Sequence, residues 1–382
     1  MPGMFRPLFL MLIASIMVFP LSAHAVEDTL DYGLYWFDGN NQSVKAVEAN
    51  GAVNNVPLRF YDPSKPTIIH FHGWQPGSAT RGDGYDREDF RFVWGDEDVI
   101  TSTSWKNKGW NIAYFYWDQF ADESEVKDAE AKMWTPNGPR GMRYRLSDGS
   151  YSTRYSPDES VGQIAFEQVT AALAGNTSYY VRLSGHSLGN QLATIVANKI
   201  SDAVYAGSVG TNVMVDRLEL LDPFWSQDGK SYLGDANGDG ANDWVGERTR
   251  WLIEKLIQRH DTPVTWYKSS GIQDVWIGDK NTALEGVVTF IHNRFWYLAS
   301  GDYVNKHNHV VPWYFRSMAS AAPEEVTINW WGGRNATGDD AASAATDDSR
   351  IRAMMGDSYH WDQVEGRYTA NPVDDQFEVK DY

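Results

Sequence analysis

The pentapeptide Gly185-His186-Ser187-Leu188-Gly189 is the feature that most constrains the fold. The residues before it, 179–183, favour a strand, and the apolar residues after it recur at helical spacing. A serine between a strand and a helix lies on a tight turn, where side chains at the two glycine positions would collide with neighbouring backbone. The pattern predicts that Ser187 is a nucleophile. A glycine-rich turn without chemistry is the alternative.

Short strand-like runs alternate with helical ones over residues 26–330, which is typical of an α/β fold with a mostly parallel central sheet flanked by helices. The expected strands are residues 33–37, 56–61, 67–71, 111–116, 179–183, 218–221, 263–267 and 287–291, with the first two as an antiparallel edge. The expected helices are residues 123–133, mostly solvated, then 161–173, 188–200, 251–257 and 309–318. Residues 119–157 are expected to form an insertion, either beside the site or on the surface. Residues 331–382 are expected to form a surface extension of the same domain.

A nucleophilic serine needs a base and a carboxylate, and in this fold the chain order is serine, acid, histidine. Asp222 follows the expected strand 218–221 and is predicted to be the acid, although Asp-Pro is also common in turns. Five histidines follow Asp222 in the sequence: His260, His292, His307, His309 and His360. His309 is predicted to be the base, because it adjoins an apolar turn that would anchor it. His307, His292 and His360 remain as alternatives, and His260 would complement a helix dipole.

Two backbone N–H groups are predicted to stabilise an oxyanion. The Leu188 N–H begins the helix that follows the serine. The Trp74 N–H follows Gly73, which permits close backbone approach after strand 67–71. His72 precedes the serine and is expected to be structural.

These motifs resemble the lipase group of α/β-hydrolases, especially pancreatic-type lipases and phospholipases A1. The matching pieces, spread over about residues 60–320, are Phe71-His72-Gly73-Trp74, Tyr116-Trp117-Asp118, Gly185-His186-Ser187-Leu188-Gly189 and Leu221-Asp222-Pro223. The resemblance implies an α/β-hydrolase fold with Ser187 and Asp222 in the triad, and acylglycerols or phospholipids as substrates. The chain departs from the animal enzymes in having no cysteine and in carrying extra residues, 202–215, between serine and acid.

The segment Asp235-Ala236-Asn237-Gly238-Asp239-Gly240-Ala241-Asn242-Asp243 reads like the first nine positions of a calcium loop. Glu would occupy the twelfth position of an EF-hand, but here that residue is Gly246, followed by Glu247. The predicted ligands of a structural Ca²⁺ within residues 235–247 are Asp235, Asn237, Asp239, the Ala241 carbonyl and Asp243. A metal-free acidic loop is the alternative. No cofactor is expected to take part in catalysis.

Residues 1–25 are expected to be a signal peptide, with a short apolar stretch and small residues at 23 and 25. The protein is therefore expected to be secreted, without a transmembrane segment in its mature chain. A formal net charge of −18 argues against nucleic acid as a partner.

The expected function is hydrolysis of a carboxylic ester through an acyl-enzyme, with an ester or a lipid as the substrate. One alternative is an esterase or depolymerase that acts on polyesters or acylated polysaccharides. The other is a non-catalytic secreted binding protein on a lipase scaffold.

Overall fold

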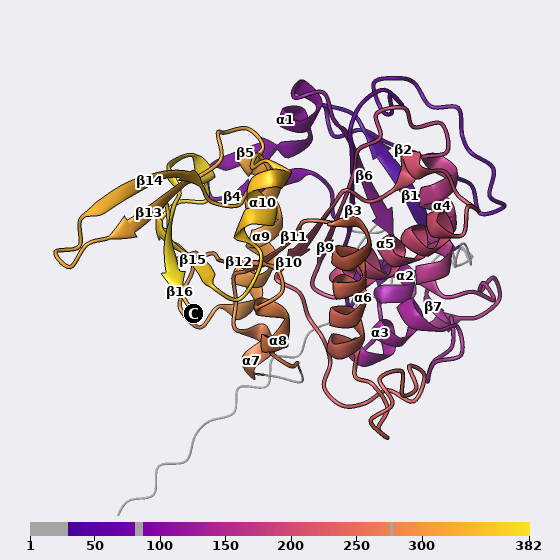
Figure 1. The fold of residues 1–382 in the computed structure, drawn as a ribbon. Coiled ribbons are helices and arrows are strands. Elements are labelled where there is room, and N and C mark those ends of the chain that lie inside the picture. The colour runs from indigo at the N-terminus through magenta and orange to yellow at the C-terminus, as the bar shows by residue number, and fades with distance from the viewer. Residues whose placement is uncertain (1–29, 81–86, 276–277) are drawn as a thin grey trace, which may run out of the picture.

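The computed structural model describes residues 30–80, 87–275 and 278–382. The expected signal peptide, residues 1–25, lies outside these ranges. Within the described residues, one 12-stranded sheet runs through the molecule in the order β14-β13-β16-β15-β12-β11-β10-β9-β3-β6-β1-β2 (Figure 1).

The central strands of this sheet pair in parallel and carry the predicted architecture. They are β6 (Asn111–Tyr116), β3 (Thr67–Phe71), β9 (Val181–His186), β10 (Arg217–Leu221), β11 (Val264–Lys268) and β12 (Thr289–His292). The edge strands β1 (Gly33–Phe37) and β2 (Ser43–Lys45) pair antiparallel. The mostly parallel α/β fold is therefore confirmed. Parallel strands all end at the same edge, so the loops after β3, β9 and β10 meet there.

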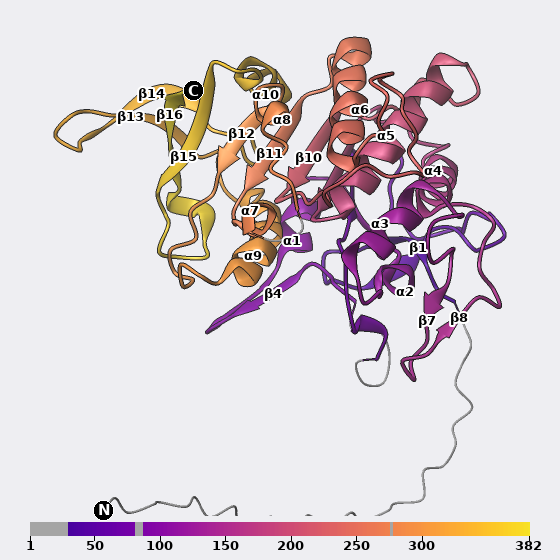
Figure 2. The same ribbon diagram turned by 90° about the horizontal axis from the view of Figure 1, so that it is seen from below.

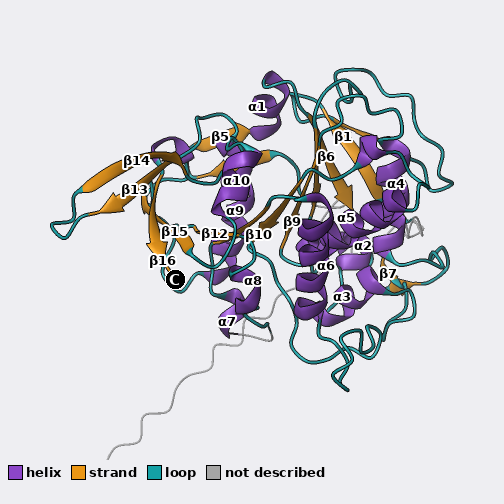
Figure 3. Ribbon diagram, in the orientation of Figure 1, coloured by secondary structure: helices purple, strands orange, loops and turns teal. Residues whose placement is uncertain are grey.

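Helices cover both faces of the sheet (Figure 3). One face carries α3 (Val126–Trp134), α4 (Val161–Ala172), α5 (Gly189–Tyr205) and α6 (Val245–His260), whose apolar side chains share one core. The other face carries α1 (Thr101–Asn107), α9 (Tyr303–Ser317) and α10 (Asp348–Met354), which share a second core. Sequence elements predicted as amphipathic thus bury their apolar sides against the sheet.

Shorter elements lie in the connections. They are the strands β4 (Arg91–Trp94), β5 (Glu97–Ile100), β7 (Tyr144–Arg145) and β8 (Tyr151–Ser152), the helices α2 (Asp118–Ala121), α7 (Ile272–Val275) and α8 (Thr282–Glu285), and the 3-10 turns η1 (Ser78–Thr80), η2 (Thr211–Val213) and η3 (Pro372–Asp374). β4 pairs with β5 as an antiparallel hairpin outside the main sheet, and β7 pairs with β8.

Two predicted elements differ from the structure. Residues 56–61 form a turn rather than a strand, because the Pro57 carbonyl accepts hydrogen bonds from the N–H groups of Phe60 and Tyr61. The helix predicted at 123–133 begins at Val126 and is mostly buried rather than solvated. Its charged Glu130 and Lys132 are buried because internal hydrogen bonds satisfy them.

The C-terminal region continues the main sheet and is not a surface extension. β15 (Tyr359–Glu365) pairs in parallel with β12 and antiparallel with β16 (Gln376–Asp381). β13 (Glu324–Ile328) then pairs with β16 and with β14 (Arg334–Asp340). Trp361 and Phe377 are buried in the second core, so this region contributes to the stability of the domain.

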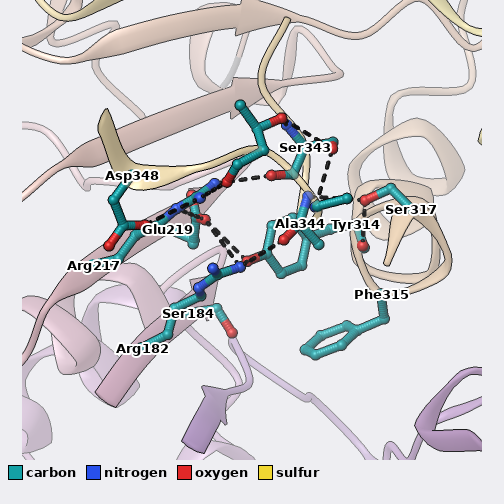
Figure 4. A network of polar contacts seen from close by, with 12 residues as sticks. Arg182, Ser184, Arg217, Glu219, Tyr314, Phe315, Ser317, Ser343, Ala344 and Asp348 are labelled. Atoms are coloured by element: carbon teal, nitrogen blue, oxygen red, sulfur yellow. Dashed lines mark hydrogen bonds and ion pairs between the residues drawn. The ribbon is translucent and has the colours of Figure 1, made fainter. Parts of the chain in front are cut away.

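A buried polar network joins residues 341–346 to the sheet (Figure 4). The Arg182 guanidinium donates to the carbonyl of Ala344 at 2.9 Å, and that of Arg217 donates to the carbonyls of Ser343 and Thr346. Glu219 lies 2.5 Å from Arg217 and accepts a hydrogen bond from Tyr314, so the buried charges are compensated.

Among the described residues, the helices are too short or too polar for any of them to cross a lipid bilayer.

Candidate active site

Ser187 lies on a sharp turn between β9 and α5, as the pentapeptide predicts. Its φ of 54° is in the left-handed region, which is uncommon for a residue with a side chain. A Cβ at Gly185 would lie 2.2 Å from the Gly189 carbonyl oxygen, and one at Gly189 would lie 2.0 Å from the Phe71 carbonyl oxygen. Glycine is therefore required at both positions for β9, α5 and the end of β3 to approach one another.

The loop after β3 passes directly beside Ser187. A Cβ at Gly73 would lie 2.6 Å from the Ser187 Cβ and 3.1 Å from its Oγ. Trp74 comes next in the chain, and its indole N–H donates to the Glu123 carbonyl at 2.7 Å. Leu188, at the N-terminus of α5, is buried. Trp74 and Leu188 are the residues predicted to donate to an oxyanion. They directly follow Gly73 and Ser187, the two residues that lie against each other here.

His72 fixes the conformation of this loop. The Trp117 N–H donates to His72 Nε2 at 3.0 Å, so Nε2 is unprotonated and Nδ1 donates to the Gly73 carbonyl at 2.9 Å. The Trp117 indole N–H also donates to the His72 carbonyl. Because both ring nitrogens are used and the side chain is fully buried, His72 has the structural role that the sequence predicts.

Asp222 follows β10 and is completely buried. Its Oδ1 accepts hydrogen bonds from the N–H groups of Ser269 at 2.9 Å and Ser270 at 3.3 Å, and its Oδ2 accepts one from the Ser270 hydroxyl. The same Oδ2 lies 2.6 Å from His307 Nδ1. Four donors thus converge on one carboxylate, which holds it in a single orientation.

Ser187 and Asp222 are also connected through the backbone. The Ser187 N–H donates to the Leu221 carbonyl at 3.2 Å, and the Phe224 N–H donates to the Ser187 carbonyl at 3.2 Å. The turn that carries Ser187 is therefore hydrogen-bonded to the chain before Asp222, at Leu221, and to the chain after it, at Phe224.

His307 is the histidine that contacts Asp222. It lies in the first turns of α9, whose N-cap Asp302 accepts a hydrogen bond from the Asn305 N–H. His186 Nε2 donates to the His307 carbonyl at 3.0 Å, and the two rings lie 4.4 Å apart. The Ser269 hydroxyl donates to the neighbouring Lys306 carbonyl at 2.8 Å. His307 thus lies between Asp222 and the chain neighbour of Ser187.

His309 lies elsewhere, so the predicted pairing of His309 with Asp222 is wrong. Residues 305–309 are part of a helix and not a loop, and two residues along a helix turn the side chain by about 200°. The His309 ring packs at 90° against Trp94, with centroids 4.5 Å apart, and its Nδ1 lies 3.1 Å from the Tyr297 hydroxyl. Burial lowers the pKa of His309 to about 4.

The other histidines that follow Asp222 are also engaged away from it. His260 Nε2 lies 2.7 Å from the Ser201 hydroxyl. His292 on β12 lies 3.3 Å from Asp362, and the His360 ring on β15 lies 5.0 Å from that of Tyr382. Among the described residues, His307 is thus the one candidate histidine that contacts Asp222.

A cavity of about 460 Å³ lies beside the site, within the usual range for small-molecule pockets. It lies between β4 and α9 and reaches His186 and Asn308, the chain neighbours of Ser187 and His307. Its remaining lining mixes charged and apolar side chains: Arg87, Glu88, Asp89, Phe90, Arg91, Phe92, Val93, Thr101, Tyr114, Val311, Pro312 and Phe315.

Sequence reasoning missed Ser269, Ser270 and Glu88. The two serines directly follow β11, the neighbour of β10 in the sheet, so polar residues at that strand end were a usable signal. Glu88 had no such signal. Burial raises the pKa of its carboxyl, and the residue lines the cavity beside the site.

The predicted calcium loop lies between β10 and α6. Asp235 accepts hydrogen bonds from three backbone N–H groups of the loop, and Asn237 donates to Glu247 at 2.9 Å. Asp243 is paired through Oδ2 with Arg248 at 2.5 Å, and its Oδ1 accepts a hydrogen bond from the Ala236 N–H of the loop at 3.2 Å. Within the described ranges no three acidic or histidine side chains are gathered as a metal site. The donor set in this conformation does not fit a closed calcium site, and calcium binding stays a prediction.

No protein-family model and no curated protein matches this chain. Among solved structures, it is similar to the esterase domain of a Rhodothermus marinus protein, with 12% identity and a TM-score of 0.31, over 76% of this chain and 97% of that one. It is similar to Est1E from Butyrivibrio proteoclasticus with bound ferulic acid, with 11% identity and a TM-score of 0.28, over 61% and 81% of the two chains. It is also similar to the butyrate-bound esterase Est2 from Thermogutta terrifontis, with 13% identity and a TM-score of 0.27, over 65% and 70%.

These solved structures are esterases, and at such low identities the likeness carries no argument about the substrate. The narrower resemblance to pancreatic-type lipases stays a prediction.

Proposed function

We propose that this protein hydrolyses carboxylic esters through an acyl-enzyme formed on Ser187. The observation that carries the proposal is the 2.6 Å hydrogen bond between His307 and the buried Asp222, at the sheet edge where Ser187 lies on its strained turn. The chain order, with the serine first, then the carboxylate and then the histidine, is that of the nucleophilic triad in α/β-hydrolases, which supports the proposal.

In the proposed first step, His307 Nε2 accepts the proton of the Ser187 hydroxyl as its Oγ attacks the ester carbonyl carbon. Asp222 holds Nδ1 of the same ring at 2.6 Å, which fixes the tautomer with Nε2 free to accept and stabilises the resulting imidazolium. The N–H groups of Trp74 and Leu188 would donate to the oxyanion, helped by the positive end of the helix dipole of α5.

The tetrahedral intermediate then expels the alcohol, to which His307 returns the proton. The acyl group remains on Ser187 Oγ. A water molecule attacks the acyl carbonyl with His307 again accepting a proton, and the carboxylic acid leaves as the serine is reprotonated. Every proton in this sequence moves through one imidazole nitrogen.

The substrate class follows from the resemblance stated above, which points to acylglycerols or phospholipids. Polyesters and acylated polysaccharides are the alternative, and the mixed lining of the 460 Å³ cavity is compatible with either. Secretion through residues 1–25 is part of the same proposal.

Labelling with a fluorophosphonate tests the nucleophile directly, because it reports an activated serine without requiring the right ester. Wild-type protein should be labelled, and Ser187→Ala should not. A panel of p-nitrophenyl esters, triolein and phosphatidylcholine then identifies the acyl substrate. Absence of labelling in the wild type, or equal labelling of Ser187→Ala, would leave the non-catalytic binding protein as the better reading.

A further inference from the structure

The hairpin formed by β13 and β14 extends away from the rest of the molecule in two perpendicular views (Figure 1, Figure 2). β14 is the last strand of the sheet, and all its residues are exposed. Residues 329–333 form the tip. Its two tryptophans are among the most exposed large apolar side chains in the described part of the protein, with Trp330 80% and Trp331 76% exposed.

Four backbone N–H groups of the tip donate to acceptors within the tip. The Asn329 side-chain oxygen accepts hydrogen bonds from the N–H groups of Trp331 at 3.1 Å and Gly333 at 2.9 Å. The Asn329 N–H donates to the Gly333 carbonyl, and the Gly332 N–H donates to the Asn329 carbonyl, both at 2.9 Å. These N–H groups would keep their partners if water were removed from the tip, which lowers the cost of entering the headgroup region of a lipid layer.

The tip carries no charge. Residues 329–333 are Asn, Trp, Trp, Gly and Gly, and Ile328 beside them is partly exposed. The first charged residue, Arg334, is paired with Glu365 behind the tip. A hairpin with an uncharged, tryptophan-bearing end and charged residues further back matches the polarity gradient of a lipid–water interface, where tryptophan is enriched.

The geometry of the two rings favours a lipid layer over a polysaccharide. The centroids of Trp330 and Trp331 lie 3.4 Å apart, with the planes tilted by 33°. One face of each ring is therefore turned to the other, so the pair does not offer two adjacent open faces for stacking against consecutive sugars. Partition into an interface needs only apolar area and a polar N–H edge, which both indoles retain.

We infer that Trp330 and Trp331 anchor the protein to a zwitterionic lipid surface by inserting the hairpin tip among the headgroups. The formal net charge of −18 disfavours an anionic membrane, so the attraction is apolar rather than electrostatic. The inference does not rest on ester hydrolysis, since the hairpin is a binding element and takes no part in the chemistry proposed for Ser187.

Flotation of the full-length protein with phosphatidylcholine vesicles tests the inference. The Ser187→Ala background removes any hydrolysis of the vesicle lipid, so a failure here is distinguishable from a failure of the proposed function. Binding should occur, should persist as the salt concentration is raised, and should fall at least about tenfold in Trp330→Ala/Trp331→Ala. Trp251→Ala, which removes an exposed indole from α6, should bind like its parent.

Fluorescence quenching by brominated phosphatidylcholine gives a second readout, because only indoles within the lipid are quenched. Quenching should be lost in the double variant while its melting curve stays that of the parent, since the tip makes no core contacts. Vesicle binding that is unchanged in the double variant would overturn the inference. Absence of vesicle binding by the parent protein would also overturn it. Sedimentation with an insoluble polysaccharide, and of the protein alone, would then show whether the tryptophans bind sugar or mediate self-association.

Discussion

His307 Nδ1 and Asp222 Oδ2 lie 2.6 Å apart, with His307 in α9 and Asp222 directly after β10, 85 positions earlier in the sequence. His309, only two residues further on, is on another side of the same helix and contacts Trp94 and Tyr297. The same substitution, histidine to glutamine, can therefore be made at His307 and at His309 on two different sides of α9, and the two variants compared.

His307→Gln should lower kcat for ester hydrolysis by about 10⁴-fold or more, because the base is lost. His309→Gln should leave kcat within about threefold of the wild type, because its side chain is outside the triad. Initial rates on p-nitrophenyl butyrate measure both. Comparable activity in the two variants would remove His307 from the proposed mechanism.

Ser270→Ala should reduce kcat about ten- to hundredfold with little change in KM, because the hydroxyl orients the carboxylate and does not contact substrate. The Asp222 carboxylate would keep its two backbone donors and His307, so the protein should still fold and still react slowly with fluorophosphonate. Ser208→Ala, at an exposed serine, is the matched control. A rise in KM alone would mean that Ser270 acts in binding and not in orienting Asp222.

The contribution of His309 to the free energy of unfolding should fall as the pH drops from about 6.5 toward 4, whereas Asp216 and Asp375, whose pKa values burial raises to about 6 and about 7, act in the opposite direction. Burial lowers the pKa of His309 to about 4, from an ordinary value near 6.5. Between these values the unfolded chain takes up a proton that the folded protein does not, so acid favours unfolding. Urea titrations at pH 7.5, 5.5 and 4.5 measure this dependence.

His309→Gln is neutral at every pH and should show a weaker loss of stability with acid than the wild type. Other buried groups, such as His70, whose pKa burial lowers to about 3, will keep part of the dependence. Identical slopes in the wild type and in His309→Gln would exclude His309 as a source of the acid sensitivity.

If the loop at residues 235–243 binds calcium, chelation should lower the melting temperature, and Asp239→Asn should abolish that change. Asp243 is engaged by Arg248 in the structure, so the ion and the guanidinium compete for one carboxylate. Arg248→Gln should therefore raise the apparent calcium affinity, as measured by calorimetry. Absence of heat in both proteins, together with a melting temperature indifferent to chelator, would show the loop to be metal-free.

The sequence predicted the parts of the fold that local patterns encode. Strand 67–71, strand 111–116 and the turn at Ser187 lie where expected, because apolar runs and paired glycines are local signals. The sequence does not predict the start of α9, because residues 305–309 are polar and their helical state depends on the Asp302 cap and on the hydrogen bonds that His307 and Lys306 make with Asp222 and Ser269. Because the helix begins at Tyr303, His307 and not His309 is on the side of α9 that contacts Asp222.

The C-terminal region was misread for a different reason. Residues 332–348 are rich in glycine, alanine and aspartate, and this composition predicts a surface extension. Residues 341–346, within that range, contain four alanines. Their carbonyls are buried because Arg182 and Arg217, more than 120 positions earlier, donate to them. Composition contains no information about such distant donors, and it therefore predicts exposure for small side chains that in fact permit this close approach.

The contacts of those two arginines also impose an order of events. A ribosome delivers β9 and β10 long before residues 343–346, and until that late segment arrives the two guanidinium groups lack the carbonyls to which they donate in the finished protein. A growing chain can therefore assemble its central strands only provisionally. The sheet that carries Ser187 can gain these hydrogen bonds only once residues 343–346 have been synthesised.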